Sequence, residues 1–202
     1  CANMGVKALQ FTGGGEPTVH PQHKEIFQYT IDKGMDLALV TNGTVMREGV
    51  PEILAKGKWV RFSIDAATSK SYSEIREVPE SFFQKALDNI TKVVEARKKE
   101  SNSDLVIGVG FVVTKENWRE IYDAVEIYSK LGVFTPEDFE YFEEFYDEAK
   151  ELVRRAKEDF ETDEYKVFDL FGDRITDLLQ HRPDYDFCSY MHLNVYIGGD
   201  LK

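Results

Sequence analysis

Short apolar runs alternate with helix-like segments over the first 133 residues, and this alternation restricts the possible folds more than any other feature. The runs are continuous, as expected of strands that are covered on both faces. The segments between them carry apolar residues at spacings of three and four, the period of an amphipathic helix. The expected strands are 6–11, 37–41, 59–65 and 105–113, and the expected helices are 21–33, 51–56, 81–99 and 118–131.

Repeated strand–helix units predict right-handed crossovers and a parallel sheet, and therefore an α/β fold. In such folds ligands bind at the carboxyl ends of the strands. Polar residues follow each of the four expected strands, at 12–16, 41–43, 63–65 and 114–117. Because the carboxyl ends of parallel strands meet at one edge, these four segments predict a single binding site.

The segment after the first strand contains three consecutive glycines, Gly13, Gly14 and Gly15, followed by Glu16 and a proline. Glycine permits a sharp turn and a close approach of the backbone to a ligand. An ionised Glu16 at the lip of that turn is an acceptor suited to a ligand ammonium group. The alternative is a simple strand-to-helix turn followed by a solvated glutamate, and these residues alone leave both interpretations open.

Composition excludes several classes of protein. The net charge of −12 argues against general nucleic-acid binding, since a polyanion would be repelled over most of the surface. No apolar run approaches the roughly 20 residues of a membrane helix, and the N-terminus lacks the order of a signal peptide, so we expect a cytoplasmic location without membrane binding. Two cysteines are too few for a secreted disulfide framework.

The chain changes character after residue 133. Residues 134–180 hold 16 Asp and Glu against 6 Lys and Arg, in an amphipathic helical pattern that begins near Thr135. A solvated acidic face is the simpler interpretation of these carboxylates, and a surface for cations or peptides is the alternative. A second helix is expected over 165–180, and residues 188–202 alternate like a strand and end in a Gly-Gly-Asp hairpin signal. Three regions are therefore expected, at 1–133, 134–183 and 184–202.

The ordered set of strand-end motifs resembles the radical S-adenosylmethionine (radical SAM) superfamily over nearly all of the first 133 residues. The family's glycine-glycine-glutamate loop is similar to Gly14-Gly15-Glu16, with Gly13 and Pro17 beside it. The resemblance implies a partial (β/α)6 TIM-like barrel, and it gives the loop and Glu16 the ammonium group of S-adenosylmethionine as their ligand.

The later strand ends extend the resemblance. Thr41, Asn42, Ser63 and Asp65 are similar to the family residues that reach the carboxylate and ribose of the cofactor, and Arg76 resembles an arginine that meets that carboxylate. By the same resemblance Val113 would support the adenine, with Asn117 close by.

Two departures accompany this resemblance. The CxxxCxxC motif that holds the family's 4Fe-4S cluster is absent, and Cys1 is interpreted as a helix cysteine rather than a cluster ligand. The family's sixth strand does not follow Val133, so either the protein departs from the barrel there or residues are missing between Val133 and Phe134. The barrel is therefore expected to be partial and the chain incomplete. The tail around Cys188 is similar to the opening of SPASM or twitch extensions, which implies a ligand of an auxiliary iron-sulfur cluster. A buried free cysteine is the alternative.

The activity implied by the resemblance is reductive cleavage of S-adenosylmethionine at a 4Fe-4S cluster. The resulting 5'-deoxyadenosyl radical takes hydrogen from a peptide or small-molecule substrate, and an electron donor such as flavodoxin or ferredoxin is implied. This chemistry needs no acid-base pair, so no catalytic residue is expected. His20 and His23 are interpreted as a polar surface turn rather than a metal pair. The alternatives are an α/β protein that binds S-adenosylmethionine or a nucleoside without radical chemistry, and an interaction protein that uses the acidic helix.

Overall fold

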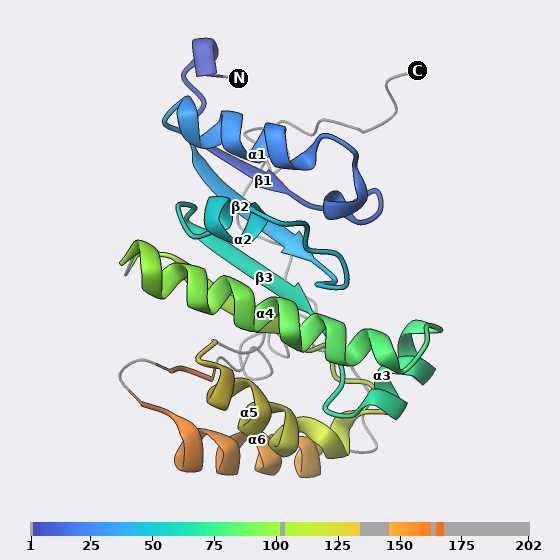
Figure 1. Cartoon of the computed structure of the whole chain (residues 1–202). Helices are drawn as coiled ribbons and strands as arrows, with labels where there is room; N and C mark the ends of the chain where they lie inside the picture. The colour runs from blue at the N-terminus through green and yellow to red at the C-terminus, as the bar shows by residue number, and fades with distance from the viewer. Residues whose placement is uncertain (1, 102–103, 134–145, 163–164, 168–202) are drawn as a thin grey trace, which may run out of the picture.

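A computed structural model describes residues 2–101, 104–133, 146–162 and 165–167. Its four strands pair in parallel, in sequence order, as one sheet (Figure 1). They are β1 (Ala8–Phe11), β2 (Asp36–Thr41), β3 (Trp59–Ser63) and β4 (Val106–Gly110). The predicted parallel α/β architecture is therefore confirmed, and each expected strand is present with shorter or slightly shifted ends.

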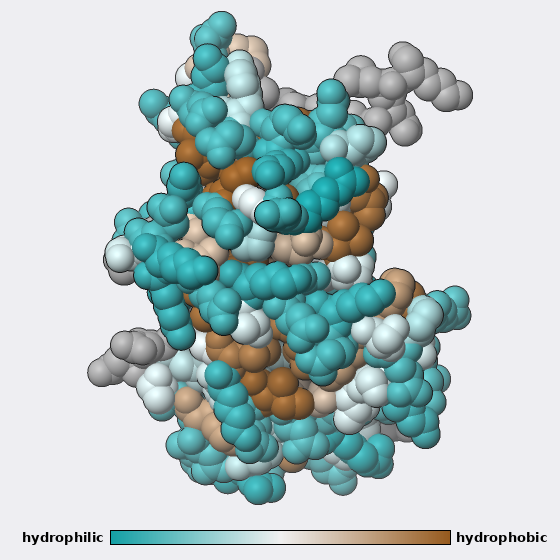
Figure 2. Space-filling model, in the orientation of Figure 1, coloured by the Kyte–Doolittle hydropathy of each residue, from teal (hydrophilic) through white to brown (hydrophobic). Residues whose placement is uncertain are grey.

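The helices also follow the expected order. They are α1 (His23–Asp32), α2 (Val50–Leu54), α3 (Ser69–Arg76), α4 (Ser81–Glu100), α5 (Ile121–Leu131) and α6 (Tyr146–Phe160). Short 3-10 turns are η1 (Ala2–Met4), η2 (Pro17–Val19) and η3 (Trp118–Glu120). Of these helices, α3 was not predicted, because its eight residues include few apolar ones. Figure 1 shows α1, α2 and α4 side by side over one face of the sheet, and Figure 2 shows that hydrophilic residues cover most of their outer surface.

The two faces of the sheet differ sharply. On β3, Val60 and Phe62 are buried, and Phe62 lies close to Ala86 of α4. Because side chains alternate along a strand, Arg61 and its neighbours at positions 59 and 63 point to the opposite face, where they are half-buried. We call the face of the sheet opposite α1, α2 and α4 the inner face. The core thus lies between the sheet and these helices, and it continues into the buried residues of α5 and α6.

Helix α6 packs on α5 at the far end of the described structure. Tyr122 of α5 meets the ring of Phe160 at 5.2 Å between centroids and donates a hydrogen bond to Asp159. Residues 165–167 are not helical, so the helix expected to begin at Tyr165 is wrong for its first three residues. The rest of that helix, the hairpin tail, Cys1 and Cys188 lie outside the described residues. None of the described helices is both long and apolar enough to cross a membrane.

Candidate functional site

The glycine loop after β1 has a backbone that other residues adopt only with strain. Gly13, Gly14 and Gly15 have φ angles of +70°, +61° and +128°. No atom of the described residues lies within 4 Å of the position that a Cβ would take on any of the three. Glycine is therefore required here by backbone conformation rather than by crowding, and the described residues leave one side of the loop open.

Glu16 links this loop to the end of β2. Its Oε1 accepts hydrogen bonds from Thr18 N at 3.0 Å, from Thr18 Oγ1 at 2.7 Å and from Thr41 Oγ1 at 2.7 Å. Its Oε2 accepts one from Asn42 N at 2.7 Å. A carboxylate oxygen can accept more than one hydrogen bond, so Oε2, with a single donor within the chain, retains an open acceptor position. Glu16 is thus a half-buried link between two strand ends rather than a freely solvated side chain.

Asp65 and Arg76 form a second cluster at the end of β3. Asp65 has a φ of +59° and is 9% exposed, and its Oδ1 accepts a hydrogen bond from Val112 N at 2.8 Å. Arg76 donates to Asp65 Oδ2 and, at 3.1 Å, to the carbonyl oxygen of Ser63. Burial raises the pKa of the Asp65 carboxyl above its usual value of 3.8, and the charge of Arg76 opposes that rise. The Nε of Arg76 is buried without a partner among the described residues.

Helix α3 brings Arg76 to the strand ends. Thr68 caps its first turn by accepting a hydrogen bond from Ser71 N at 3.2 Å. Glu120 Oε2 accepts hydrogen bonds from Ala67 N and Ser71 Oγ, both at 2.7 Å, and so ties the start of α3 to the segment before α5. The cap residue Thr68 was the one local signal in the sequence that could have indicated this helix.

Three of the predicted site residues are buried beneath the strand ends. Asn117 is fully buried; its Nδ2 donates to Asp65 O and to Val112 O, both at 2.8 Å, and its Oδ1 accepts from Thr114 N at 2.7 Å. Thr41 is 2% exposed, and its Oγ1 accepts a hydrogen bond from Gly43 N at 3.0 Å while it donates to Glu16. Val113 is fully buried in the core. These side chains therefore hold the strand ends in place.

The charged residues of both clusters affect the pKa of Tyr72. Its side chain is 2% exposed and packs against Phe83 with ring centroids 5.7 Å apart. Burial raises the pKa of Tyr72, and the charges of Asp65 and Glu16 raise it further while that of Arg76 opposes them. Glu16, Asp65 and Arg76 therefore act on the same buried phenol, as residues gathered at one edge of the sheet would. No local pattern in the sequence indicates this role of Tyr72.

The two histidines near α1 are both engaged through their Nδ1 atoms. His23 Nδ1 is 2.7 Å from the carbonyl oxygen of His20, and His20 Nδ1 accepts a hydrogen bond from Gln22 N at 3.2 Å. His23 is 1% exposed and packs edge-on to Phe27, so the expectation of a surface turn is wrong for this residue. Within the described ranges, no group of three or more His, Cys, Asp and Glu side chains is placed to hold a metal ion.

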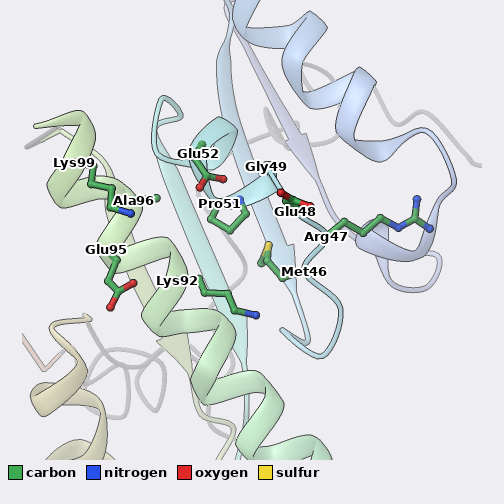
Figure 3. A pocket seen from close by; sticks show the side chains of 10 residues that line it. All are labelled: Met46, Arg47, Glu48, Gly49, Pro51, Glu52, Lys92, Glu95, Ala96 and Lys99. Atoms are coloured by element: carbon green, nitrogen blue, oxygen red, sulfur yellow. The ribbon is translucent and has the colours of Figure 1, made fainter.

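A cavity of about 320 Å³ lies away from the strand ends, between α4 and the segment leading into α2 (Figure 3). Its charged lining is mixed, with Lys92 and Lys99 of α4 beside acidic residues such as Glu52 and Glu95. This balance of charge favours no particular ligand, so the candidate site remains the edge at which the four strands end.

Known proteins resemble this chain in both sequence and fold. It is 30% identical over 131 residues to the "Tungsten-containing aldehyde ferredoxin oxidoreductase cofactor-modifying protein" of Pyrococcus furiosus, covering 63% of this chain and 36% of that protein. It is 30% identical over 133 residues to the "AdoMet-dependent heme synthase" of Methanosarcina barkeri, covering 65% and 36%. It is 31% identical over 131 residues to the "Antilisterial bacteriocin subtilosin biosynthesis protein AlbA" of Bacillus subtilis, covering 63% and 27%. The chain thus spans about a third of the length of these relatives.

A solved structure of Streptococcus suis SuiB bound to the precursor peptide SuiA matches with a TM-score of 0.60 and 16% identity. The match covers 82% of this chain and 39% of that one. At this identity the likeness concerns the fold. The family model described as "Radical SAM superfamily" matches residues 1–128. This chain therefore belongs to the radical SAM superfamily.

Proposed function

We propose that this chain is part of an enzyme that cleaves S-adenosylmethionine reductively and uses the product to take hydrogen from a peptide or small-molecule substrate. Family membership implies S-adenosylmethionine and a 4Fe-4S cluster. When bound and reduced, the cluster would supply the electron that breaks the C5'–S bond of S-adenosylmethionine, giving methionine and a 5'-deoxyadenosyl radical. The observation that carries the proposal is that two oppositely charged groups at one sheet edge have unused hydrogen-bonding capacity. These groups are the acceptor Glu16 Oε2 and the donor Arg76 Nε.

These two atoms suit the two charged ends of an amino acid. The methionine part of the cofactor carries an ammonium and a carboxylate on one carbon. Glu16 Oε2 has an open acceptor position for the ammonium, and Arg76 Nε is a buried cationic donor for the carboxylate. The open side of the loop from Gly13 to Gly15 leaves room for the ligand. The residues therefore fit S-adenosylmethionine.

The remaining predicted residues divide into two groups in this proposal. We assign direct contacts to Asn42, Ser63 and Asp65, which flank the two clusters, with Asp65 oriented toward the ribose. Its two oxygens each accept one hydrogen bond within the chain and so retain further acceptor positions. We assign positioning roles to Thr41, Val113 and Asn117, because all three are buried and the two polar ones are already hydrogen-bonded.

The cluster ligands are proposed to lie in another part of the protein, since this chain has only two cysteines and no CxxxCxxC motif. Cys188 is proposed as one ligand of an auxiliary cluster in an extension of the SPASM or twitch kind. A flavodoxin- or ferredoxin-like protein in the cytoplasm is proposed as the electron donor. The name of the Bacillus subtilis relative and the peptide bound to SuiB support a peptide as one candidate substrate.

The test uses the product of the complete gene, purified without oxygen. Iron is measured by metal analysis, and 5'-deoxyadenosine by mass spectrometry after addition of S-adenosylmethionine and a strong reductant. We expect about four irons with cofactor cleavage for the radical enzyme, and appreciably more iron if Cys188 binds an auxiliary cluster. A protein that binds S-adenosylmethionine without iron and without cleavage would instead be the non-radical binding protein.

A further inference from the structure

Tyr72 lies on the same face of α3 as Arg76, one helical turn before it. Residues four apart on a helix are neighbours on its surface, so the two side chains leave α3 on the same side. Arg76 reaches Asp65 and the carbonyl oxygen of Ser63 at the end of β3, and α3 lies beyond that strand end (Figure 1). Tyr72 is therefore directed toward the candidate cofactor site.

The charges that act on Tyr72 locate its hydroxyl. Burial raises the pKa of this phenol most, and the charges of Arg76, Asp65 and Glu16 act on it as well. These three residues come from separate parts of the chain, namely α3, the segment after β3 and the loop after β1. Because charge interactions weaken with distance, a group that responds to all three lies near the edge at which they meet. The raised pKa also keeps the phenol protonated at neutral pH, so it is a hydrogen-bond donor there.

The hydroxyl of Tyr72 makes no hydrogen bond with any residue that the structure describes. Two other buried tyrosines differ in this respect, since Tyr128 and Tyr165 each donate to a backbone carbonyl oxygen. The ring of Tyr72 packs on Phe83, and a phenylalanine would make that contact equally well. Packing therefore accounts for the ring but not for the hydroxyl. A polar group on so buried a side chain is expected to have a partner.

The hydroxyl is also accessible to a ligand. Tyr72 is 2% exposed, and its hydroxyl is not among the fully enclosed polar atoms of the described residues that lack a partner. The small exposed part of the side chain therefore includes the hydroxyl, and a molecule bound at the strand ends can reach it.

We propose that the hydroxyl of Tyr72 donates a hydrogen bond to the carboxylate of S-adenosylmethionine, as a further cofactor-binding residue. The inference rests on the proposed function and adds one contact to it. A carboxylate has two oxygens, and Arg76 and Tyr72 offer one donor each from the same side of α3. Glu16 and Asp65 are acceptors that oppose an anion at this edge, so a second donor beside Arg76 offsets part of that repulsion.

The experiment uses the complete gene product with its clusters, without reductant. Equilibrium dialysis with detection by mass spectrometry measures binding of S-adenosylmethionine and of decarboxylated S-adenosylmethionine, which keeps the amine and lacks the carboxylate. The proteins compared are the wild type, Tyr72→Phe and Tyr122→Phe, and urea unfolding of the same preparations measures their stability. Tyr122 donates to Asp159 where α5 meets α6, and its replacement removes the same phenol hydroxyl, so Tyr122→Phe is the matched control.

We expect Tyr72→Phe to bind S-adenosylmethionine about tenfold more weakly than the wild type, because it loses a hydrogen bond to a charged group. Its stability should be unchanged, since the hydroxyl has no partner to lose within the described structure. Both proteins should bind the decarboxylated probe alike, and Tyr122→Phe should match the wild type with both probes. Unchanged affinity of Tyr72→Phe for S-adenosylmethionine, or an equal loss for both probes, would overturn this inference alone. A wild type that neither binds nor cleaves S-adenosylmethionine would overturn the proposed function as well.

Discussion

Replacement of Glu16 by alanine is the perturbation that tests the candidate site most directly. The carboxylate has two tasks at this position. It accepts four hydrogen bonds that join the glycine loop to Thr18, Thr41 and Asn42, and it retains an acceptor position for the cofactor ammonium on Oε2. Alanine removes both tasks together, whereas glutamine keeps an acceptor oxygen and loses the charge.

Cofactor affinity measures the contact with the ammonium group, and the free energy of unfolding measures the internal hydrogen bonds. A hydrogen bond to a charged group contributes about 1.5–3 kcal/mol, so loss of the ammonium partner should weaken S-adenosylmethionine binding about 10- to 150-fold. Loss of the internal hydrogen bonds should lower the free energy of unfolding by about 2–4 kcal/mol, since the half-buried site lets water replace part of each bond. Glu16→Gln should lose most of the affinity and less of the stability.

The assay combines equilibrium dialysis of S-adenosylmethionine with urea unfolding of the same preparations. Thr18→Val is the control, because it removes one hydrogen bond to Glu16 Oε1 and leaves the charge and Oε2 in place. It should destabilise the protein by about 1 kcal/mol and leave cofactor affinity nearly unchanged. A folded Glu16→Ala protein with unchanged affinity would refute the ammonium assignment and leave Glu16 a purely structural link.

Three further predictions concern the framework of the site. Asn117→Ala should lower the free energy of unfolding by about 2–4 kcal/mol in urea titrations, because it leaves buried partners unpaired; a change below 0.5 kcal/mol would contradict this. Arg76→Gln should weaken S-adenosylmethionine binding about tenfold or more in dialysis, and unchanged affinity would remove Arg76 from the site. Gly15→Ala should cost about 1–3 kcal/mol through its φ of +128°, whereas Gly110→Ala, whose Cβ meets only ordinary contacts, should cost less in the same titration.

The order of the elements could be predicted because it depends on local pattern. Apolar runs and three-and-four spacing indicated the four strands and the helices α1, α2, α4 and α5. Strand ends were less predictable, since they depend on distant partners. β4 ends at Gly110, three residues before the apolar run does, because Asp65 Oδ1 and Asn117 Nδ2 take the backbone groups of Val112.

Helix α3 shows a second limit of local pattern. Its residues are mostly polar, so neither hydrophobic period nor apolar content identified it, yet it carries Arg76 to Asp65. The helix is held from outside its own sequence, by Glu120 on the segment before α5. That contact joins residues about fifty positions apart, and no local signal encodes such a partner.

The sequence by itself determined the family resemblance, the parallel α/β order and the grouping of polar residues at the strand ends. These follow from residue types at short spacing, which act through backbone preference and side-chain period. Only the tertiary structure decided which polar residues remain open to a ligand. The polar atoms of Thr41 and Asn117 are already engaged in internal hydrogen bonds, whereas Glu16 Oε2 and Arg76 Nε retain hydrogen-bonding capacity. Hydrogen-bond saturation is a property of the packed chain, because each donor finds its acceptor only after the strands have come together.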